Sequence, residues 1–194
     1  MLSKNIHNFI ACDAEYEDAD IVIFGAGFDG TTSFRPGTRF GPSAIRNESF
    51  GIETYSPYQD KDMLDYSYFD SGDLELAFGS TNRVIADIAM RTDRILTDGK
   101  IPFMIGGEHL VTLGAVMAVT EKIDDLYIIH FDAHADLRDD YLGQKLSHAC
   151  VLRRCHDIVG EREYREQTGR AEILLAKKAD EVVRVICGIG QKIK

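Results

Sequence analysis

Short apolar runs alternate with amphipathic segments along the first 160 residues, and this alternation constrains the fold more than any other feature. The runs at 21–24, 101–105 and 126–131 have the length and composition of buried strands. The segment 80–98 repeats its apolar residues about every 3.6 positions and is followed by Gly99, which predicts a helix with a glycine cap. Strands and helices that alternate in this way predict a parallel α/β sheet with helices on both faces.

Further elements follow from proline, glycine and apolar spacing. Helices are predicted at 42–47, 110–119 and 146–158, and the segment 31–42 is predicted to be a loop. In sheets of this kind, ligands bind just beyond the carboxyl ends of the strands. The residues after Ile105 and Phe131 are therefore the first places to look for a site.

Composition narrows the class of protein. The 194 residues, 44% of them hydrophobic, are enough for one domain with its own core, spanning 1–194. A net charge of −10 without a basic run argues against nucleic acid and anionic membranes as partners. No membrane span and no signal peptide are recognised, and the four cysteines lack CxxC spacing. We therefore expect a cytoplasmic protein with reduced thiols.

Three potential metal ligands, Asp132, His134 and Asp136, follow the strand predicted at 126–131. Alternate side chains of an extended chain point the same way, and two carboxylates buried with an imidazole need a counter-charge. Oxygen and nitrogen ligands without thiolate favour Mn²⁺, Mg²⁺, Fe²⁺ or Zn²⁺. The alternative is that the aspartates only cap the next segment. His130 lies within the apolar run and is predicted to be a hydrogen-bonded core or strand-end residue, not a ligand.

Two further histidines are candidates. The glycine turn 106–107 would bring His109 over the sheet edge as a fourth ligand, although it could also be a polar residue at a helix start. His148 follows Asp136 by twelve residues. Because imidazole exchanges protons near neutral pH, His148 is a candidate proton shuttle, with an ordinary surface or capping histidine as the alternative.

A competing motif is G-x-G-x-x-G at 25–30, which follows a strand as in dinucleotide-binding domains. That motif requires a helix to begin at its end, so that the helix N-terminus holds the pyrophosphate. The residues that follow are expected to form a loop. A dinucleotide-binding domain is therefore kept only as an alternative.

Three motifs in this order resemble the ureohydrolase family of arginases and agmatinases. They are RPGTRFGPSAIR at 35–46, GGEH at 106–109 and HFDAHAD at 130–136. The loop 136–143 with the following Ser147-His148 is most similar to the agmatinase branch. The resemblance covers about 20–157 and implies a three-layer arginase-like α/β fold with a mainly parallel sheet. The motif at 35–42 is expected to be structural.

The resemblance also implies a binuclear manganese site. Asp132 would bridge the two Mn²⁺ ions, His109 and Asp136 would bind one ion, and His134 would bind the other. His148 would occupy the position of the catalytic histidine. The implied reaction is attack of a metal-bridging hydroxide on a guanidino carbon, with hydrolysis of agmatine to putrescine and urea. Arginine, guanidinobutyrate and formiminoglutamate remain open as substrates, and a homo-oligomer is implied by the relatives.

The sequence departs from this family in its last part. Relatives carry a second motif, S-x-D-x-D-x-x-D-P, that supplies further metal ligands, whereas only Asp157 and Asp180 follow Asp140 here. The tail 160–194 is not recognised, although a helix at 171–181 and a strand at 182–186 are expected there.

We therefore expect an incomplete ureohydrolase domain that lacks the C-terminal third of the fold. Such a chain would bind at most one metal ion well, turn over slowly or not at all, and expose strand edges. A non-catalytic truncated remnant is the main alternative. A single-zinc deacetylase of related fold is a weaker one.

Overall fold

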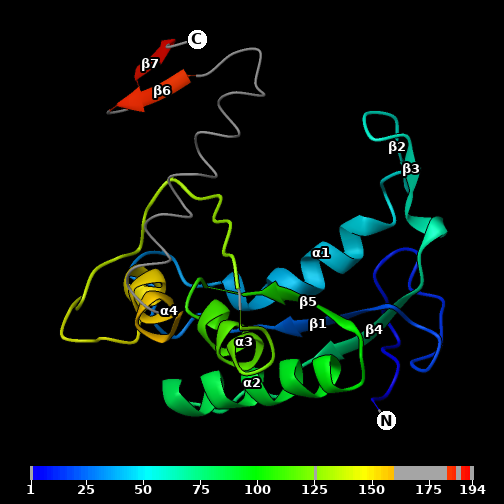
Figure 1. The fold of residues 1–194 in the computed structure, drawn as a ribbon, viewed down its shortest axis with the longest axis horizontal. Coiled ribbons are helices and arrows are strands. Elements are labelled where there is room, and N and C mark those ends of the chain that lie inside the picture. The colour runs from blue at the N-terminus through cyan, green and yellow to red at the C-terminus, as the bar shows by residue number, and fades with distance from the viewer. Residues whose placement is uncertain (1, 125, 160–182, 187–188, 193–194) are drawn as a thin grey trace.

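A parallel sheet forms the centre of the computed structural model, which describes residues 2–124, 126–159, 183–186 and 189–192 (Figure 1). The sheet has three strands in the order β4-β1-β5. Its strands are β1 (Ile21–Ala26), β4 (Tyr68–Asp73) and β5 (Ile101–Gly106). Both β4 and β5 run parallel to β1. The predicted parallel sheet is confirmed, and β4 is a strand that the apolar pattern did not predict.

Helices cover both faces of the sheet, as expected for a three-layer fold. The side chains of β1 alternate, so that Val22 and Phe24 pack on one face of the sheet, and Ile23 packs on the other with Cys12 and Ile105. The layer on the first face is α2 (Thr81–Thr97) with α3 (Val111–Thr120), and α1 (Gly41–Ser49) lies on the opposite side in Figure 1.

Local sequence accounts for the helix boundaries. The Ser80 hydroxyl accepts a hydrogen bond from the Arg83 backbone N–H and caps α2. Gly99 ends the same helix in the left-handed region, with φ 74°. Pro42 lies in the first turn of α1, where its missing N–H costs no hydrogen bond. The helices predicted at 42–47, 80–98 and 110–119 are therefore confirmed.

The remaining elements are short. The helix predicted at 146–158 begins later than expected, as a 3-10 turn that continues into α4. The segment 31–42 is a loop up to Gly37, continues as a 3-10 turn at 38–40, and its last two residues begin α1. The short elements are η1 (Thr38–Phe40), β2 (Tyr55–Ser56), β3 (Lys61–Asp62), η2 (Met63–Asp65), η3 (His148–Cys150), α4 (Val151–Val159), β6 (Val183–Ile186) and β7 (Ile189–Lys192). The last two pair antiparallel, so the strand expected at 182–186 is present, whereas 171–181 lies outside the described residues.

The strand predicted at 126–131 is wrong, because this segment forms no ladder with any strand that the structure describes. A strand is stable only when a neighbour satisfies its backbone N–H and C=O groups, and β5 pairs with β1 alone. Ile129 and Phe131 are consequently 67% and 87% exposed. Among the described strands, β5 therefore has an open edge, as expected for an incomplete sheet.

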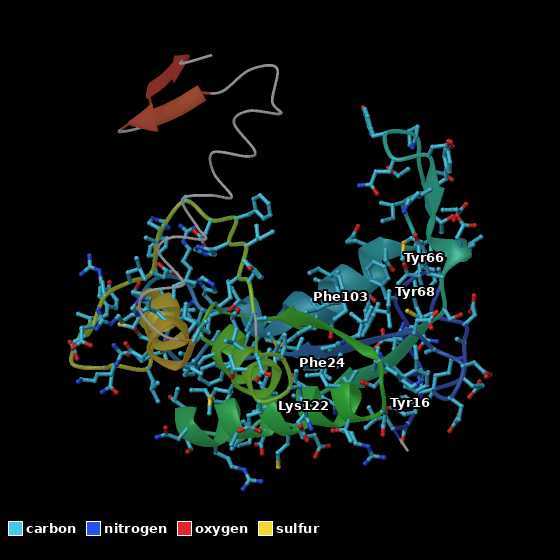
Figure 2. All side chains as sticks on the ribbon, viewed as in Figure 1. Tyr16, Phe24, Tyr66, Tyr68, Phe103 and Lys122 are labelled. Atoms are coloured by element: carbon cyan, nitrogen blue, oxygen red, sulfur yellow. The ribbon has the colours of Figure 1, made fainter. Side chains whose placement is uncertain are left out.

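Burial differs sharply between the centre and this edge. Phe24 on β1 is fully buried, whereas Phe103 on β5 is 56% exposed (Figure 2). Tyr16 closes the core near the N-terminus and packs edge-on against Phe69, with ring centroids 5.3 Å apart.

Among the described residues, no helix is both long and apolar enough to cross a bilayer.

A buried ion pair fixes α1 against β4. The Arg46 guanidinium donates two hydrogen bonds, of 2.7 and 2.9 Å, to the Asp70 carboxylate and also bonds to Asp73. Arg46 and Asp70 are almost fully buried. Bidentate pairing of this kind satisfies both charges, and removal of one partner would leave the other buried and unpaired. Arg46 is the last residue of the RPGTRFGPSAIR motif, so this part of the motif is structural.

Candidate metal centre

An open cleft of about 930 Å³ lies beyond the carboxyl end of β5. Its walls come from the loop after β1, the turn after β5, the segment 132–138 and the start of η3. The five residues singled out in the sequence all line this cleft, namely His109, Asp132, His134, Asp136 and His148. The structure therefore brings together side chains that are up to 39 positions apart, at the sheet edge where parallel α/β proteins bind ligands.

His109 and Asp136 are in direct contact. The His109 Nδ1 lies 2.6 Å from Asp136 Oδ2, and both side chains are largely buried. Asp136 has a φ of 46°, in the left-handed region that aspartate tolerates better than most residues. Its backbone carbonyl accepts the N–H groups of Leu152 and Arg153 at the start of α4. The start of α4 thus holds the Asp136 backbone in a conformation that directs its carboxylate at His109.

The two carboxylate oxygens of Asp132 lie near different histidines. Oδ2 is 3.8 Å from His109 Nδ1, and Oδ1 is 3.6 Å from His134 Nδ1. The backbone N–H of His134 hydrogen-bonds to Oδ1 and, with three neighbouring imidazoles, holds the pKa of the Asp132 carboxyl below its usual range, against the opposing effect of burial. Asp132 is therefore anionic near neutral pH, and its oxygens are oriented to bind on two sides.

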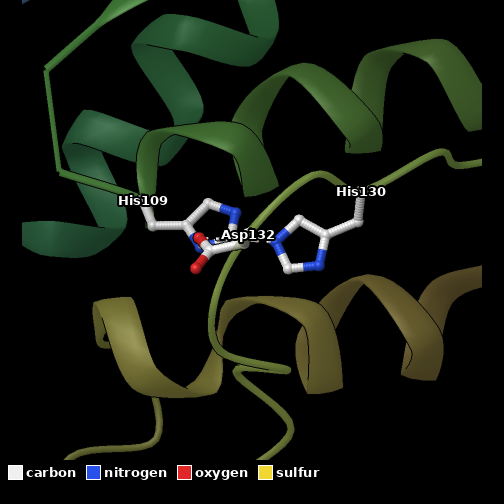
Figure 3. A group of neighbouring side chains, drawn as sticks. All are labelled: His109, His130 and Asp132. Carbon is white, nitrogen blue, oxygen red and sulfur yellow. Dashed lines mark ion pairs between the residues drawn. The ribbon is translucent and has the colours of Figure 1, made fainter. Parts of the chain in front are cut away.

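His134 is the most exposed of the candidate ligands, with 82% of its side chain accessible. His130 is not exposed in the same way, and its ring stacks on that of His109 with centroids 5.1 Å apart. The sequence pattern predicts His130 to be a core or strand-end residue. The structure instead brings it next to the two ligand candidates His109 and Asp132 (Figure 3).

His148 is held by a residue that sequence reasoning missed. Its backbone N–H donates to the Thr31 hydroxyl, and its Nδ1 lies 2.8 Å from the Thr31 carbonyl oxygen. The Thr31 hydroxyl in turn donates to the buried carboxylate of Glu108. Glu108 directly precedes His109 in the GGEH motif. A carboxylate next to a glycine turn was therefore the feature of the sequence that could have indicated its structural role. Thr31 offered no signal, because its partners are 77 and 117 positions away.

The glycines at 25–30 lie close to other parts of this protein, which leaves no room for a side chain at these positions. A Cβ on Gly25 would lie 1.9 Å from an Asp73 oxygen, and one on Gly27 would lie 2.5 Å from the Arg39 carbonyl oxygen. No helix begins at Gly30, where a dinucleotide fold needs one. The structure therefore does not support a dinucleotide-binding domain.

The donor set of the cleft fits a divalent cation. Three carboxylates and three imidazoles line it, those of Glu108, Asp132, Asp136, His109, His134 and His148, and oxygen and nitrogen ligands of this kind suit Mn²⁺ and its neighbours. The two Asp132 oxygens approach different imidazoles, Oδ2 those of His109 and His130 and Oδ1 that of His134. The cleft is lined by three acidic side chains, Glu108, Asp132 and Asp136, and by one basic side chain, Arg138. This excess of negative charge favours a cationic ligand.

The fold and this cleft define a parallel α/β protein with an acidic ligand site at the carboxyl edge of its sheet. The chain belongs to the arginase family, since the sequence profile described as "Arginase family" matches residues 19–183. That match begins before β1 and extends past the three motifs.

The similar proteins include agmatinases. The Bacillus subtilis agmatinase is 49% identical over 152 residues, which are 78% of this chain and 52% of the relative. A Clostridium difficile protein, provisionally named an agmatinase, has a crystal structure with a TM-score of 0.74 and 50% identity, covering 82% of this chain and 61% of that one. The agmatine ureohydrolase of Thermoplasma volcanium gives a TM-score of 0.75 at 36% identity, over 82% and 53%. These likenesses confirm the arginase-type fold.

These alignments cover most of this chain but only part of each relative. The chain spans about half the length of the curated relatives that it matches.

Proposed function

We propose that the cleft is part of a ureohydrolase active site that uses Mn²⁺ to hydrolyse a guanidino compound, with agmatine as the first candidate substrate. The observation that carries this proposal is the convergence of His109, Asp132, His134, Asp136 and His148 on one cleft. Agmatine is preferred because the B. subtilis and T. volcanium relatives are named for it. The products would be putrescine and urea.

In this proposal His109, Asp132 and Asp136 would hold one ion, and Asp132 with His134 would contribute to a second. When bound, the ions would lower the pKa of a coordinated water and so supply a nucleophile at neutral pH. Asp132 contributes through its low pKa, because it stays ionised and need not lose a proton when a cation binds. The second ion would have fewer protein ligands than the first, so its affinity would be lower.

His148 would transfer the proton. A carbonyl oxygen only accepts hydrogen bonds, so the contact with Thr31 places the proton on Nδ1 and leaves a lone pair on Nε2 of the neutral ring. Nε2 could then accept a proton from the attacking water. The same proton would pass to the amine nitrogen as its bond to the guanidino carbon breaks, and the hydroxyl proton of the collapsing intermediate would follow to the departing amine, so that the cationic guanidino group and water give urea and a protonated amine.

The first test uses the 194-residue chain itself. Apoprotein is titrated with Mn²⁺ under electron paramagnetic resonance, and urea release from agmatine is measured in parallel. We expect at most one tightly bound ion per chain and slow or absent turnover. Two tightly bound ions with rapid urea release would contradict the expected loss of the second site.

A chimera tests the function of the cleft when the rest of a full-length relative is joined to it. Residues 1–159 of this chain are joined to the corresponding remainder of the B. subtilis agmatinase, and agmatine, arginine and guanidinobutyrate are offered as substrates. We expect urea release from agmatine and its loss in the His148→Ala chimera. A folded chimera that binds Mn²⁺ but releases no urea would favour the non-catalytic remnant.

A further inference from the structure

A smaller cavity of about 270 Å³, the side cavity, adjoins the metal-site cleft. The two share three lining residues, Thr32, Ser33 and Tyr141, and none of the candidate metal ligands lines the side cavity. Sites for whole drug-sized ligands measure roughly 300–1,000 Å³. The side cavity therefore has the size to hold one end of a small ligand whose other end lies in the cleft.

Hydroxyl groups are the main polar groups of the side cavity, and none of its lining side chains is charged. The aliphatic hydroxyls are those of Thr31, Thr32, Ser33, Thr81 and Ser147. Three of them donate their only proton to a protein acceptor. These pairs are Thr31 with the Glu108 carboxylate, Thr32 with the Asp29 carbonyl oxygen and Ser147 with the Cys150 sulfur. Because a hydroxyl has one proton and two lone pairs, these three oxygens can only accept further hydrogen bonds.

A lining of acceptors favours a ligand that brings hydrogen-bond donors. An alkylammonium group brings three donors and no acceptor, and its apolar stem can lie against Leu142 and Leu146, which also line the cavity. The buried Glu108 carboxylate adds a full negative charge one hydrogen bond away, through Thr31. The N-terminus of α2 at Thr81 has the opposite effect but carries only about half a charge. Both the donor requirement and the Glu108 charge therefore favour a cation.

Tyr141 connects the side cavity with the proposed proton shuttle. Its ring packs edge-on against that of His148, with centroids 5.5 Å apart, and Tyr141 lines both cavities. Two backbone hydrogen bonds of 3.0 Å between Tyr141 and Gln144 close a turn that fixes this part of the wall. A ligand that extends from His148 along Tyr141 would therefore enter the side cavity.

We propose that the side cavity is a binding site for an alkylammonium group, with the Thr81 and Ser147 hydroxyls among its acceptors. In the reaction proposed above, this site would hold the end of the substrate opposite to the guanidino group, a role that rests on the proposed function. It would favour a guanidino compound that ends in an amine, as agmatine does. Guanidinobutyrate, which ends in a carboxylate, would bind less well.

The test is a nuclear magnetic resonance titration of the metal-free, ¹⁵N-labelled full chain with putrescine. Succinate, which has the same number of carbons and the opposite charge, is titrated in parallel at constant ionic strength. We expect putrescine to cause saturable shifts of the backbone amides of Thr81, Gln144 and Ser147, and succinate to cause none. The proposal is overturned if putrescine leaves these amides unshifted, or if succinate shifts them and putrescine does not.

Thr81→Val tests the contribution of one hydroxyl, because it keeps the size of the side chain and leaves the Ser80 cap of α2 in place. The Kd for putrescine should rise about tenfold, as expected for one hydrogen bond to a charged group. Thr97→Val is the matched control, since it makes the same replacement at the exposed far end of α2, outside both cavities. An unchanged Kd in Thr81→Val, or an equal rise in Thr97→Val, would contradict the proposal.

The wild-type titration covers the case in which Thr81→Val does not fold. It also separates the alkylammonium site from the proposed function, because it requires neither a metal ion nor turnover. Failure to bind Mn²⁺ or to release urea would count against the proposed function alone. Absence of the putrescine shifts would count against the alkylammonium site alone.

Discussion

At the scale of single residues, the cleft depends on side chains that are not expected to bind a metal. Glu108 is 5% exposed and uses both carboxylate oxygens. One accepts from the Thr31 backbone and hydroxyl, and the other accepts from the Leu110 N–H just before α3. A carboxylate is favourable at a helix start because it satisfies free N–H groups. Glu108 thereby joins the loop that holds His148 to the helix that follows His109.

Thr31→Val tests this connection, because it removes the hydroxyl and leaves a side chain of similar size. Glu108 would lose one buried hydrogen bond and the His148 N–H would lose its acceptor. We expect the free energy of unfolding to fall by about 1–3 kcal/mol, measured by urea denaturation. Thr31→Ser keeps the hydroxyl and should retain most of the stability. Equal stability of the wild type and the valine variant would contradict the connection.

A second residue-scale prediction concerns pH. The Arg39 guanidinium, helped by the Gly37 N–H, holds the pKa of the buried Asp29 carboxyl below its usual range, although burial opposes this. The resulting stability is present above the pKa of an unfolded aspartate, about 4. It is lost as the pH falls through the lower folded-state pKa.

Asp29→Asn should therefore be less stable than the wild type at pH 7, and the difference should shrink toward pH 3. Urea midpoints at several pH values measure this. Asp18→Asn, at an exposed aspartate, serves as the control and should follow the wild type. A constant difference between Asp29→Asn and the wild type at all pH values would contradict the assignment.

The ligand candidates could be proposed from sequence because they are concentrated in two short motifs after apolar runs. The structure places those candidates in one cleft. Their roles as metal ligands and proton shuttle stay predictions. The apolar neighbours of His130 predict a core or strand-end residue, and spacing alone cannot reveal that its ring stacks on that of His109. Thr31 and Glu108 act through contacts between distant segments, and those contacts become visible only once the chain is folded.

At the scale of elements, the contact between α2 and α3 shapes the layer beneath the sheet. Gly114 of α3 lies against α2 so closely that a Cβ there would be 2.6 Å from the Ile85 carbonyl oxygen and 2.8 Å from Ile88 Cβ. The small residue therefore sets the distance between the two helices. The start of α3 follows directly from the GGEH turn, so this spacing also positions His109.

Gly114→Ala should separate the helices and destabilise the fold by about 1–3 kcal/mol, the usual cost of overpacking. Thermal or urea unfolding measures the change. Gly51→Ala is the matched control, because a Cβ there would meet only the Glu48 carbonyl oxygen at 3.4 Å. If both variants unfold alike, Gly114 does not limit the helix contact.

Helices were easier to predict than strands in this chain, for a physical reason. A helix such as α2 satisfies its backbone internally and carries its cap and its apolar stripe in its own sequence. A strand needs a partner elsewhere. The segment 126–131 has a strand-like sequence but no described partner, whereas β4 contains Asp70 and Gly72 and still forms a strand because β1 pairs with it.

At the scale of the whole molecule, β5 has an open edge among the strands that the structure describes. Ile101 and Phe103 on this strand are 60% and 56% exposed, and Phe131 is 87% exposed. An unpaired edge with apolar side chains is a template for pairing with another chain. We therefore expect the isolated protein to self-associate.

Phe103→Lys should reduce this self-association, since a charge on an edge strand opposes pairing with another copy. Sedimentation velocity over a range of concentrations measures the effect. Phe78→Lys adds the same charge at a fully exposed loop residue and should have little influence. If the two variants behave alike, net charge and not the β5 edge governs association.

The buried ion pair of Arg46 with Asp70 has a consequence for how genes of this kind are recognised. The end of the RPGTRFGPSAIR motif is committed to holding α1 on the sheet, and Arg46 does not line the cleft. The presence of this motif therefore indicates the packing of α1 on the sheet and does not report on the metal ligands. A genome search built on that motif would collect partial and full-length genes together, whereas a search that also requires both aspartate motifs would separate them.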